Sequence, residues 1–217
     1  MKTWAVFDVD GTLLPGASME TIFIRECLRR RVIPLRNWAR AGWGIVKNLA
    51  REDWRLTARG NKMYLKNLPV KKVTEIAGEI FDDLISPAFS RAGQQKVRDL
   101  KQRGYGILLM TGSPCFLTKY LSDIFDYDEL ICTKLETSEE HFTGKISGRH
   151  PFGEIKRDIL LQKKAALEID FFASHAFANH ESDVWHLALF GNAVAVNPDA
   201  GLRYIAQMRG WQMEHWE

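Results

Sequence analysis

Two acidic residues near the N-terminus have a spacing suited to phosphate chemistry. Asp8 and Asp10 directly follow an apolar, β-prone run at residues 3–7, and Gly11 and Thr12 come next. In an extended segment, side chains two residues apart project to the same side, and paired carboxylates favour a hard cation such as Mg²⁺. One carboxylate can then attack phosphorus while the other protonates the leaving oxygen. Alone, the pattern is also typical of a surface turn or an Asx cap.

The elements around these acids alternate between strands and helices. Strands are expected at residues 3–7, 105–110, 129–132, 169–173 and 193–196, helices at 19–31, 73–84, 90–103 and 153–167, and a hairpin near 139–141. This alternation predicts an α/β fold with a parallel sheet. Ligands bind at the carboxyl ends of such strands, where the aspartates, Thr111, Asn179 and Asp183 follow.

Residues 15–89 show only helical patterns, which predicts an all-helical insertion between core segments 1–14 and 90–217. Residues 15–90 contain 14 lysines and arginines against 8 acidic residues, although the whole chain has a net charge of only +3. A segment with this excess faces an anionic partner or simply forms a solvated helix surface.

The run from Asp8 to Leu14 resembles the first motif of the haloacid dehalogenase superfamily of phosphohydrolases. Thr111 matches the second motif, Lys156 at the start of a predicted helix matches the third, and the segment 178–183 aligns with the fourth. The insertion and the C-terminal run 194–199 resemble the phosphoserine-phosphatase-like branch (subfamily IB). The resemblance spans essentially the whole chain and implies a Rossmann-like core with a helical cap.

The same resemblance implies a role for each matched residue. Asp8 is the expected nucleophile and Asp10 the expected general acid and base. The Thr111 hydroxyl and the Gly112 amide would hold the transferring phosphate. Lys156 would neutralise charge on the nucleophile and the phosphate.

The fourth motif departs from the family pattern, because Asn179 stands where an aspartate usually binds the metal. The expected metal ligands are Asp8, Asp10, Asn179 and Asp183. An amide oxygen still coordinates a cation but carries no charge, so we expect weaker metal affinity. Glu181 is an alternative ligand, two residues out of register.

Three histidines in the same region, His175, His180 and His186, raise the alternative of a zinc site. No cysteine lies near them in the sequence, and their spacing does not form a helical i, i+4 pair. Loop and packing roles are therefore the favoured interpretation of these histidines.

The cellular location is expected to be cytoplasmic. No apolar run approaches the roughly 18 residues of a membrane-spanning helix, and the two aspartates interrupt the stretch where a secretory signal would be apolar. The three cysteines lack the spacing of a disulfide framework, and we expect reduced thiols.

The insertion also interleaves arginines with Trp38, Trp43 and Trp54. This composition suits a peripheral contact with a phospholipid surface, although core tryptophans beside a solvated basic face are the favoured interpretation. Nucleic-acid contact is a further interpretation, although no nucleic-acid partner is expected.

These features together predict a Mg²⁺-dependent phosphatase that acts through an aspartyl-phosphate on a phosphorylated small molecule or lipid head group. Two alternatives remain open from the sequence. One is a catalytically weakened member that binds an anionic membrane or partner. The other is a phosphotransferase, in which an alcohol replaces water in the second step.

Overall fold

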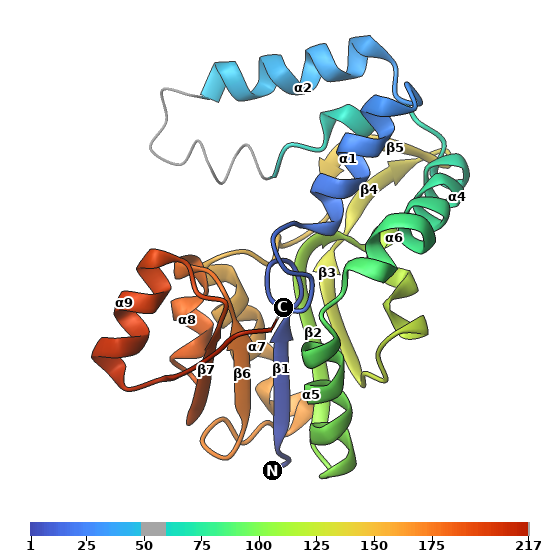
Figure 1. Cartoon of the computed structure of the whole chain (residues 1–217). Helices are drawn as coiled ribbons and strands as arrows, with labels where there is room; N and C mark the ends of the chain where they lie inside the picture. Colours follow the sequence, from blue (N-terminus) through green and yellow to red (C-terminus); the bar gives the residue numbers. More distant parts are fainter. Residues whose placement is uncertain (49–59, 217) are drawn as a thin grey trace.

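Figure 1 shows a computed structural model that describes residues 1–48 and 60–216. Its central strands are β1 (Trp4–Asp8), β2 (Gly106–Pro114), β3 (Glu129–Thr133), β6 (His175–Ala178), β7 (Asn192–Val196) and β8 (Gln212–Glu214). They form one sheet in the order β3-β2-β1-β6-β7-β8, and every neighbouring pair is parallel. The α/β, Rossmann-like fold predicted from the sequence is confirmed.

Helices cover both faces of this sheet. They are α5 (Arg91–Gln102), α7 (Glu154–Leu167), α8 (Val184–Leu187) and α9 (Ala200–Arg209). Phe7 packs in the buried cluster that contains Val97 of α5, whereas Val6 packs in the cluster with Leu160 of α7 and Leu202 of α9. Because β1 is buried on both faces, its sequence is a continuous apolar run rather than an alternating one.

The strand expected at residues 169–173 is wrong in position, since β6 begins only at His175. Ile169 makes one isolated bridge to Lys2. Asp170 Oδ1 then accepts hydrogen bonds from the backbone N–H groups of Phe172 and Ala173, at 3.1 and 3.2 Å. These amides close an Asx-type turn and do not join the ladder.

The insertion lies above the carboxyl edge of the sheet in Figure 1. Its regular elements are α1 (Met19–Arg29), α2 (Leu35–Asn48), the short helical segments η1 (Met63–Leu65), η2 (Phe81–Ile85) and η3 (Ser86–Ala88), and α4 (Val70–Ile80). Ser18 caps α1 by accepting a hydrogen bond from the Thr21 N–H at 3.1 Å. Every regular element described between residues 15 and 89 is helical.

A hairpin from a distant part of the sequence attaches to the insertion. It consists of β4 (Leu135–Ser138) and β5 (His141–Ile146), with the turn at residues 139–140 that the sequence predicts. The Asn67 N–H donates to Phe142 O at 2.8 Å, and the Phe142 N–H donates to Leu68 O at 3.0 Å. The Val70 N–H adds a third bond, to Glu140 O at 2.8 Å.

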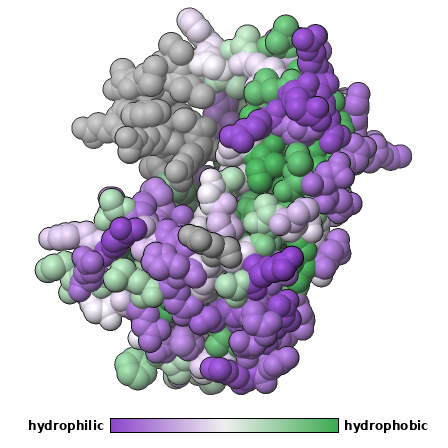
Figure 2. All heavy atoms as spheres, viewed as in Figure 1, coloured by the Kyte–Doolittle hydropathy of each residue, from purple (hydrophilic) through white to green (hydrophobic). Residues whose placement is uncertain are grey.

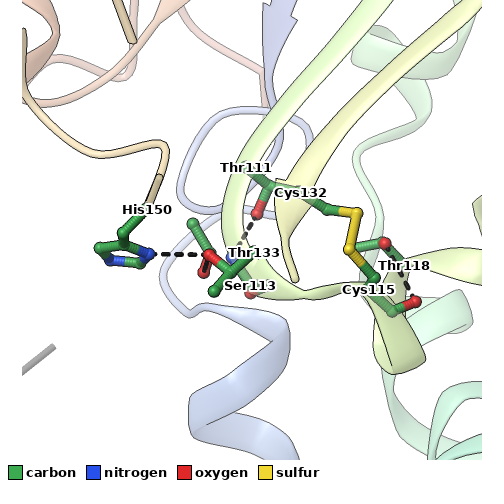
Figure 3. The surroundings of a disulfide bond; sticks show 8 residues. Thr111, Ser113, Cys115, Thr118, Cys132, Thr133 and His150 are labelled. Carbon is green, nitrogen blue, oxygen red and sulfur yellow. Dashed lines mark hydrogen bonds between the residues drawn. A yellow bond between two sulfur atoms is a disulfide. The ribbon is translucent and has the colours of Figure 1, made fainter. Parts of the chain in front are cut away.

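The expectation of three reduced thiols is wrong, because Cys115 and Cys132 form a disulfide (Figure 3). Cys115 starts the short helix α6 (Cys115–Thr118) directly after β2, and Cys132 lies near the end of β3. The register that pairs Pro114 with Thr133 brings the two Cα atoms within 5.3 Å. Cys27 is a buried free thiol.

The described part of the basic insertion combines packed and exposed tryptophans. Trp38 stacks on Tyr64 with ring centroids 5.7 Å apart, whereas Trp43 is 71% exposed. Figure 2 shows hydrophobic side chains gathered between the insertion helices and the core, with hydrophilic ones over most of the core's visible face. Trp54, Arg51, Arg55 and Arg59 lie outside the described residues. No helix in the described ranges is long and apolar enough to cross a membrane.

Candidate active site

A buried lysine joins two acidic residues at the carboxyl edge of the sheet. Asp8 is the last residue of β1, Lys156 lies in the first turn of α7, and Asp183 lies in the loop after β6. Lys156 Nζ donates to Asp8 Oδ1 at 2.6 Å and to Asp183 Oδ1 at 2.7 Å. All three side chains are at least 95% buried. Three sequence-predicted site residues therefore meet in one cluster.

The electrostatics of this cluster follow from burial and from the shared lysine. Burial raises the pKa of Asp8 to about 7, although the Lys156 ammonium acts in the opposite direction. For Asp183, the pKa is lowered, because the interactions with Lys156 outweigh the effect of burial. Burial disfavours the ammonium, but both carboxylates raise the Lys156 pKa. One lysine charge faces two carboxyl groups, so the negative charge of the ionised cluster is not fully neutralised and favours a second cation.

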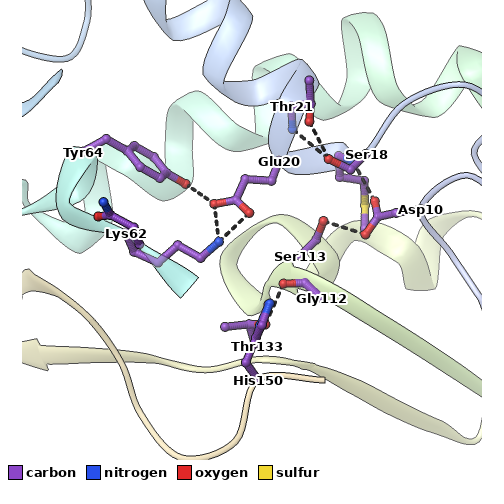
Figure 4. A network of polar contacts seen from close by, with 12 residues as sticks. Asp10, Ser18, Glu20, Thr21, Lys62, Tyr64, Gly112, Ser113, Thr133 and His150 are labelled. Atoms are coloured by element: carbon purple, nitrogen blue, oxygen red, sulfur yellow. Dashed lines mark hydrogen bonds and ion pairs between the residues drawn. The ribbon is translucent and has the colours of Figure 1, made fainter. Parts of the chain in front are cut away.

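Asp10 is held by three hydrogen-bond donors, of which Figure 4 shows the Ser113 hydroxyl. Its Oδ1 accepts from the Met19 N–H at 2.8 Å, and its Oδ2 accepts from the Ser113 hydroxyl at 2.8 Å and from the Thr111 hydroxyl. The ladder between β2 and β3 is irregular between Met110 and Pro114, so residues 111–113 near the end of β2 do not pair with β3. We call these three residues the Gly112 loop. Sequence reasoning missed Ser113, although a hydroxyl directly after Thr111 and Gly112 was a usable signal.

Thr111 lies behind the site rather than on its surface. Its side chain is fully buried, and its hydroxyl donates to Asp10 and accepts from the Ser113 N–H at 2.9 Å. Gly112 and Ser113, in contrast, line the cavity described below. The loop therefore presents its Gly112 backbone and the Ser113 side chain to a ligand.

Asn179 occupies the position of the altered fourth motif, and its side chain packs against Gly11. The Thr12 hydroxyl donates to Asp8 Oδ2 at 2.9 Å, and its oxygen lies 3.2 Å from Asn179 Oδ1. Gly11 has φ +88°, and a Cβ there would lie 2.3 Å from Asn179 Nδ2. Position 11 therefore requires glycine, both because of its positive φ and because Asn179 leaves no space for a Cβ.

The sequence left two alternative metal sites open, one with Glu181 as a ligand and one a zinc site of three histidines. Neither arrangement is formed in the part of the chain that the structure describes. A Cβ on Gly201 of α9 would lie 2.0 Å from Glu181 Oε2, so the Glu181 side chain is directed at α9. His175 stacks on Phe177, whereas His186 is fully buried. Within residues 1–48 and 60–216, no group of three or more histidine, cysteine or acidic side chains is arranged to hold a metal ion.

A cavity of about 620 Å³ lies between the core and the insertion. This volume is within the range of small-molecule sites. The core contributes Asp8, Asp10, Gly112, Lys156, Asn179 and Asp183 to its lining, and the insertion contributes Ser18, Glu20, Thr21 and Arg25. Glu20 also accepts hydrogen bonds from the buried Lys62 ammonium, at 2.6 and 2.7 Å, and from the Tyr64 hydroxyl at 2.7 Å (Figure 4).

The donor set in this cavity fits Mg²⁺. Asp8, Asp183 and Asn179 line the cavity and carry side-chain oxygens, the hard ligands that Mg²⁺ prefers. Asn179 differs from the two aspartates in that its amide oxygen carries no charge.

Comparison with known proteins assigns the family. The model of the haloacid dehalogenase-like hydrolases matches residues 5–187, and the chain belongs to this family of enzymes. Phosphoserine phosphatase SerB1 of Mycobacterium tuberculosis is 27% identical over 214 residues, which cover 96% of this chain and 69% of that protein.

Solved structures support the same fold. A protein of unknown function from Bordetella pertussis Tohama I has a TM-score of 0.82 and 26% identity, and the match covers 99% of this chain and 98% of that one. A phospho-aspartyl intermediate analogue of phosphoserine phosphatase has a TM-score of 0.68 at 17% identity, covering 100% of this chain and 94% of that one.

Proposed function

We propose that this enzyme is a Mg²⁺-dependent phosphatase that hydrolyses a small phosphomonoester through an aspartyl-phosphate on Asp8. The observation that carries the proposal is the buried Lys156 bridge between Asp8 and Asp183 at the floor of a cavity. A carboxylate fixed in this way and open to a ligand is suited to in-line attack on phosphorus. Asp8, the Asp10 carbonyl, Asn179 and Asp183 would hold the metal, which neutralises phosphate charge when bound.

The chemistry divides into two steps. In the first, an Asp8 carboxylate oxygen attacks phosphorus, the bond from phosphorus to the leaving oxygen breaks, and Asp10 gives that oxygen a proton. In the second, water attacks the phosphoryl group on Asp8, Asp10 accepts a proton from the water, and phosphate and the Asp8 carboxylate are released. Lys156 and the Gly112 loop stabilise the charge on the transferring oxygens.

We further propose that residues 15–89 act as a cap that encloses the leaving group. Ser18, Glu20, Thr21 and Arg25 bring polar groups of both charges to the cavity, which suits a small polar leaving group. Phosphoserine is the first substrate to test, because a relative is named for it. A lipid head-group phosphate is the second.

The test is hydrolysis of an aryl phosphate and of phosphoserine with Mg²⁺ by the wild type and two variants. Asp8→Asn should lose turnover by roughly a thousandfold or more, because it removes the nucleophile. Asp126→Asn is the matched control, since the Asp126 side chain is 80% exposed and does not line the cavity. Thermal unfolding checks that both variants fold.

Three results would contradict the proposal. Retained turnover in Asp8→Asn would exclude Asp8 as the nucleophile. A wild type that binds anionic liposomes and hydrolyses no phosphomonoester would favour the non-catalytic alternative. Transfer of phosphate to an added alcohol, measured by product analysis, would instead indicate a phosphotransferase.

A further inference from the structure

A single directed chain of hydrogen bonds runs from His150 to Asp10. We propose that His150 and Thr133 are positioning residues that fix the Gly112 loop and Asp10 through this chain. Neither residue belongs to the four sequence motifs. The catalytic part of this inference rests on the proposed function.

The direction of the chain follows from hydrogen counting at Thr133. Its hydroxyl oxygen lies 2.6 Å from Gly112 O and 2.7 Å from His150 Nδ1 (Figure 3). A carbonyl oxygen only accepts, so the one hydroxyl hydrogen is donated to Gly112 O. The Thr133 oxygen must then accept from His150, which places a proton on Nδ1.

The next link is the peptide unit between Gly112 and Ser113. Its C=O accepts from Thr133, and its N–H donates to Thr111 Oγ1 at 2.9 Å. Both ends of this peptide are therefore fixed by hydroxyl groups. The Thr111 hydroxyl in turn donates to Asp10 Oδ2. Every donor points in the same direction, which strengthens the chain cooperatively.

Burial makes this chain consequential. The side chains of Thr133 and Thr111 are both fully buried, so neither hydroxyl exchanges its partners for water. Without the Thr133 hydroxyl, Gly112 O loses a buried donor, and the peptide is free to rotate. Rotation would displace both the loop that faces the phosphate and the Thr111 hydroxyl that holds Asp10.

The kinetic test compares two replacements of Thr133. Thr133→Val keeps the shape and removes the hydroxyl, and it should lower kcat roughly 10- to 100-fold, the cost of one buried unsatisfied group. Thr133→Ser keeps the hydroxyl and should retain kcat within about threefold of the wild type. Equal kcat in Thr133→Val and the wild type would overturn the proposal.

Thr118→Val is the matched control. Thr118 is also fully buried, and its hydroxyl donates to a backbone carbonyl, that of Cys115, at 3.3 Å, outside the chain. It should keep kcat within about threefold. A loss as large as that of Thr133→Val would show that any buried threonine in this region has the same effect, and would overturn the proposal.

A second measurement needs no turnover. In ¹⁵N-histidine-labelled protein at pH 8, the His150 resonance, assigned with His150→Gln, should report a proton on Nδ1, and Thr133→Val should remove that preference. A wild-type proton on Nε2 alone would overturn the inference whatever the activity. Inactive wild type with the Nδ1 proton present would refute the proposed function and the catalytic role of the chain, while leaving the chain's geometry intact.

Discussion

The backbone N–H of Met19, the first residue of α1, donates a hydrogen bond of 2.8 Å to Asp10 Oδ1. This bond ties the first helix of the insertion to the proposed general acid in the core. Because Asp10 Oδ2 is held by the Ser113 and Thr111 hydroxyls, its carboxylate connects the two parts of the molecule. A shift of α1 relative to the sheet would therefore change the surroundings of this proposed general acid directly.

Replacing Lys156 should destabilise the fold strongly. Lys156→Met leaves two buried carboxyl groups without their cation, and we expect a loss of about 3–5 kcal/mol in the free energy of unfolding. Lys163→Met is the control, because Lys163 lies on the same helix and pairs with Glu129 nearer the surface. That pair should contribute at most about 1 kcal/mol. Urea unfolding measures both, and equal losses would contradict the role assigned to burial.

Restoring the usual acid at position 179 should strengthen metal binding. Asn179→Asp adds a negative charge to the proposed ligand set, and the Mg²⁺ concentration for half-maximal activity should fall roughly tenfold. Asn192→Asp, at an exposed position outside the cavity, should leave it unchanged. A Mg²⁺ titration of turnover gives the answer, and an unchanged or raised requirement would show that Asn179 is not a ligand.

Gly11 and Gly104 separate two costs of adding a side chain. Both have positive φ, +88° and +84°, but only Gly11 faces a neighbour within 4 Å. Gly104→Ala should cost about 1–2 kcal/mol, the strain of the left-handed conformation alone. Gly11→Ala should cost more and should also lower turnover, because it displaces Asn179. Similar losses of stability with full activity in both variants would contradict the packing of Asn179 on Gly11.

The disulfide should contribute measurably to stability. It joins residues 17 apart, and a loop of this size corresponds to about 3 kcal/mol. Unfolding in urea with and without dithiothreitol measures this contribution. The Cys115→Ala/Cys132→Ala double variant should be weakened to the same extent and should not respond to dithiothreitol, which controls for Cys27. No difference between oxidised and reduced wild type would contradict the prediction.

The acid dependence of stability should include a contribution from Glu26. Hydrogen bonds from Arg29 and Arg30 lower the pKa of Glu26 to about 2, from an ordinary value of 4.5. The ion pairs of Glu26 with the two arginines therefore stabilise the fold above about pH 4.5, and this stabilisation is lost as the pH falls toward 2. In urea unfolding, the difference between wild type and Glu26→Gln should shrink over this window. A constant difference would exclude the ion pair as its cause.

Local sequence signals predicted the parts of the molecule that depend on neighbouring residues. The run before Asp8 identified β1, and the helical spacing after Ser18 identified α1. The positions of Lys156 and Asp183 came from the motif resemblance, and the sheet brings both to Asp8. Motif order was therefore sufficient to locate the three residues, whereas the contact of Lys156 with Asp183 comes from the structure.

Contacts that depend on register were not predictable in the same way. Cys115 and Cys132 meet because of how β2 pairs with β3, and no spacing rule encodes that pairing. The same register brings Thr133 to Gly112. β6 was misplaced because the Asp170 side chain, rather than hydrophobic periodicity, decides where the ladder begins.

The attachment of β5 to residues 67–70 limits how the insertion can be exchanged between relatives. A chimera that transplants residues 15–89 alone would leave the backbone groups of Asn67, Leu68 and Val70 facing a foreign hairpin. The segment 135–146 must therefore be transplanted together with residues 15–89. The smallest transferable unit for redesigning the cavity is thus two separate stretches of sequence, residues 15–89 and 135–146, with β2 and β3 between them.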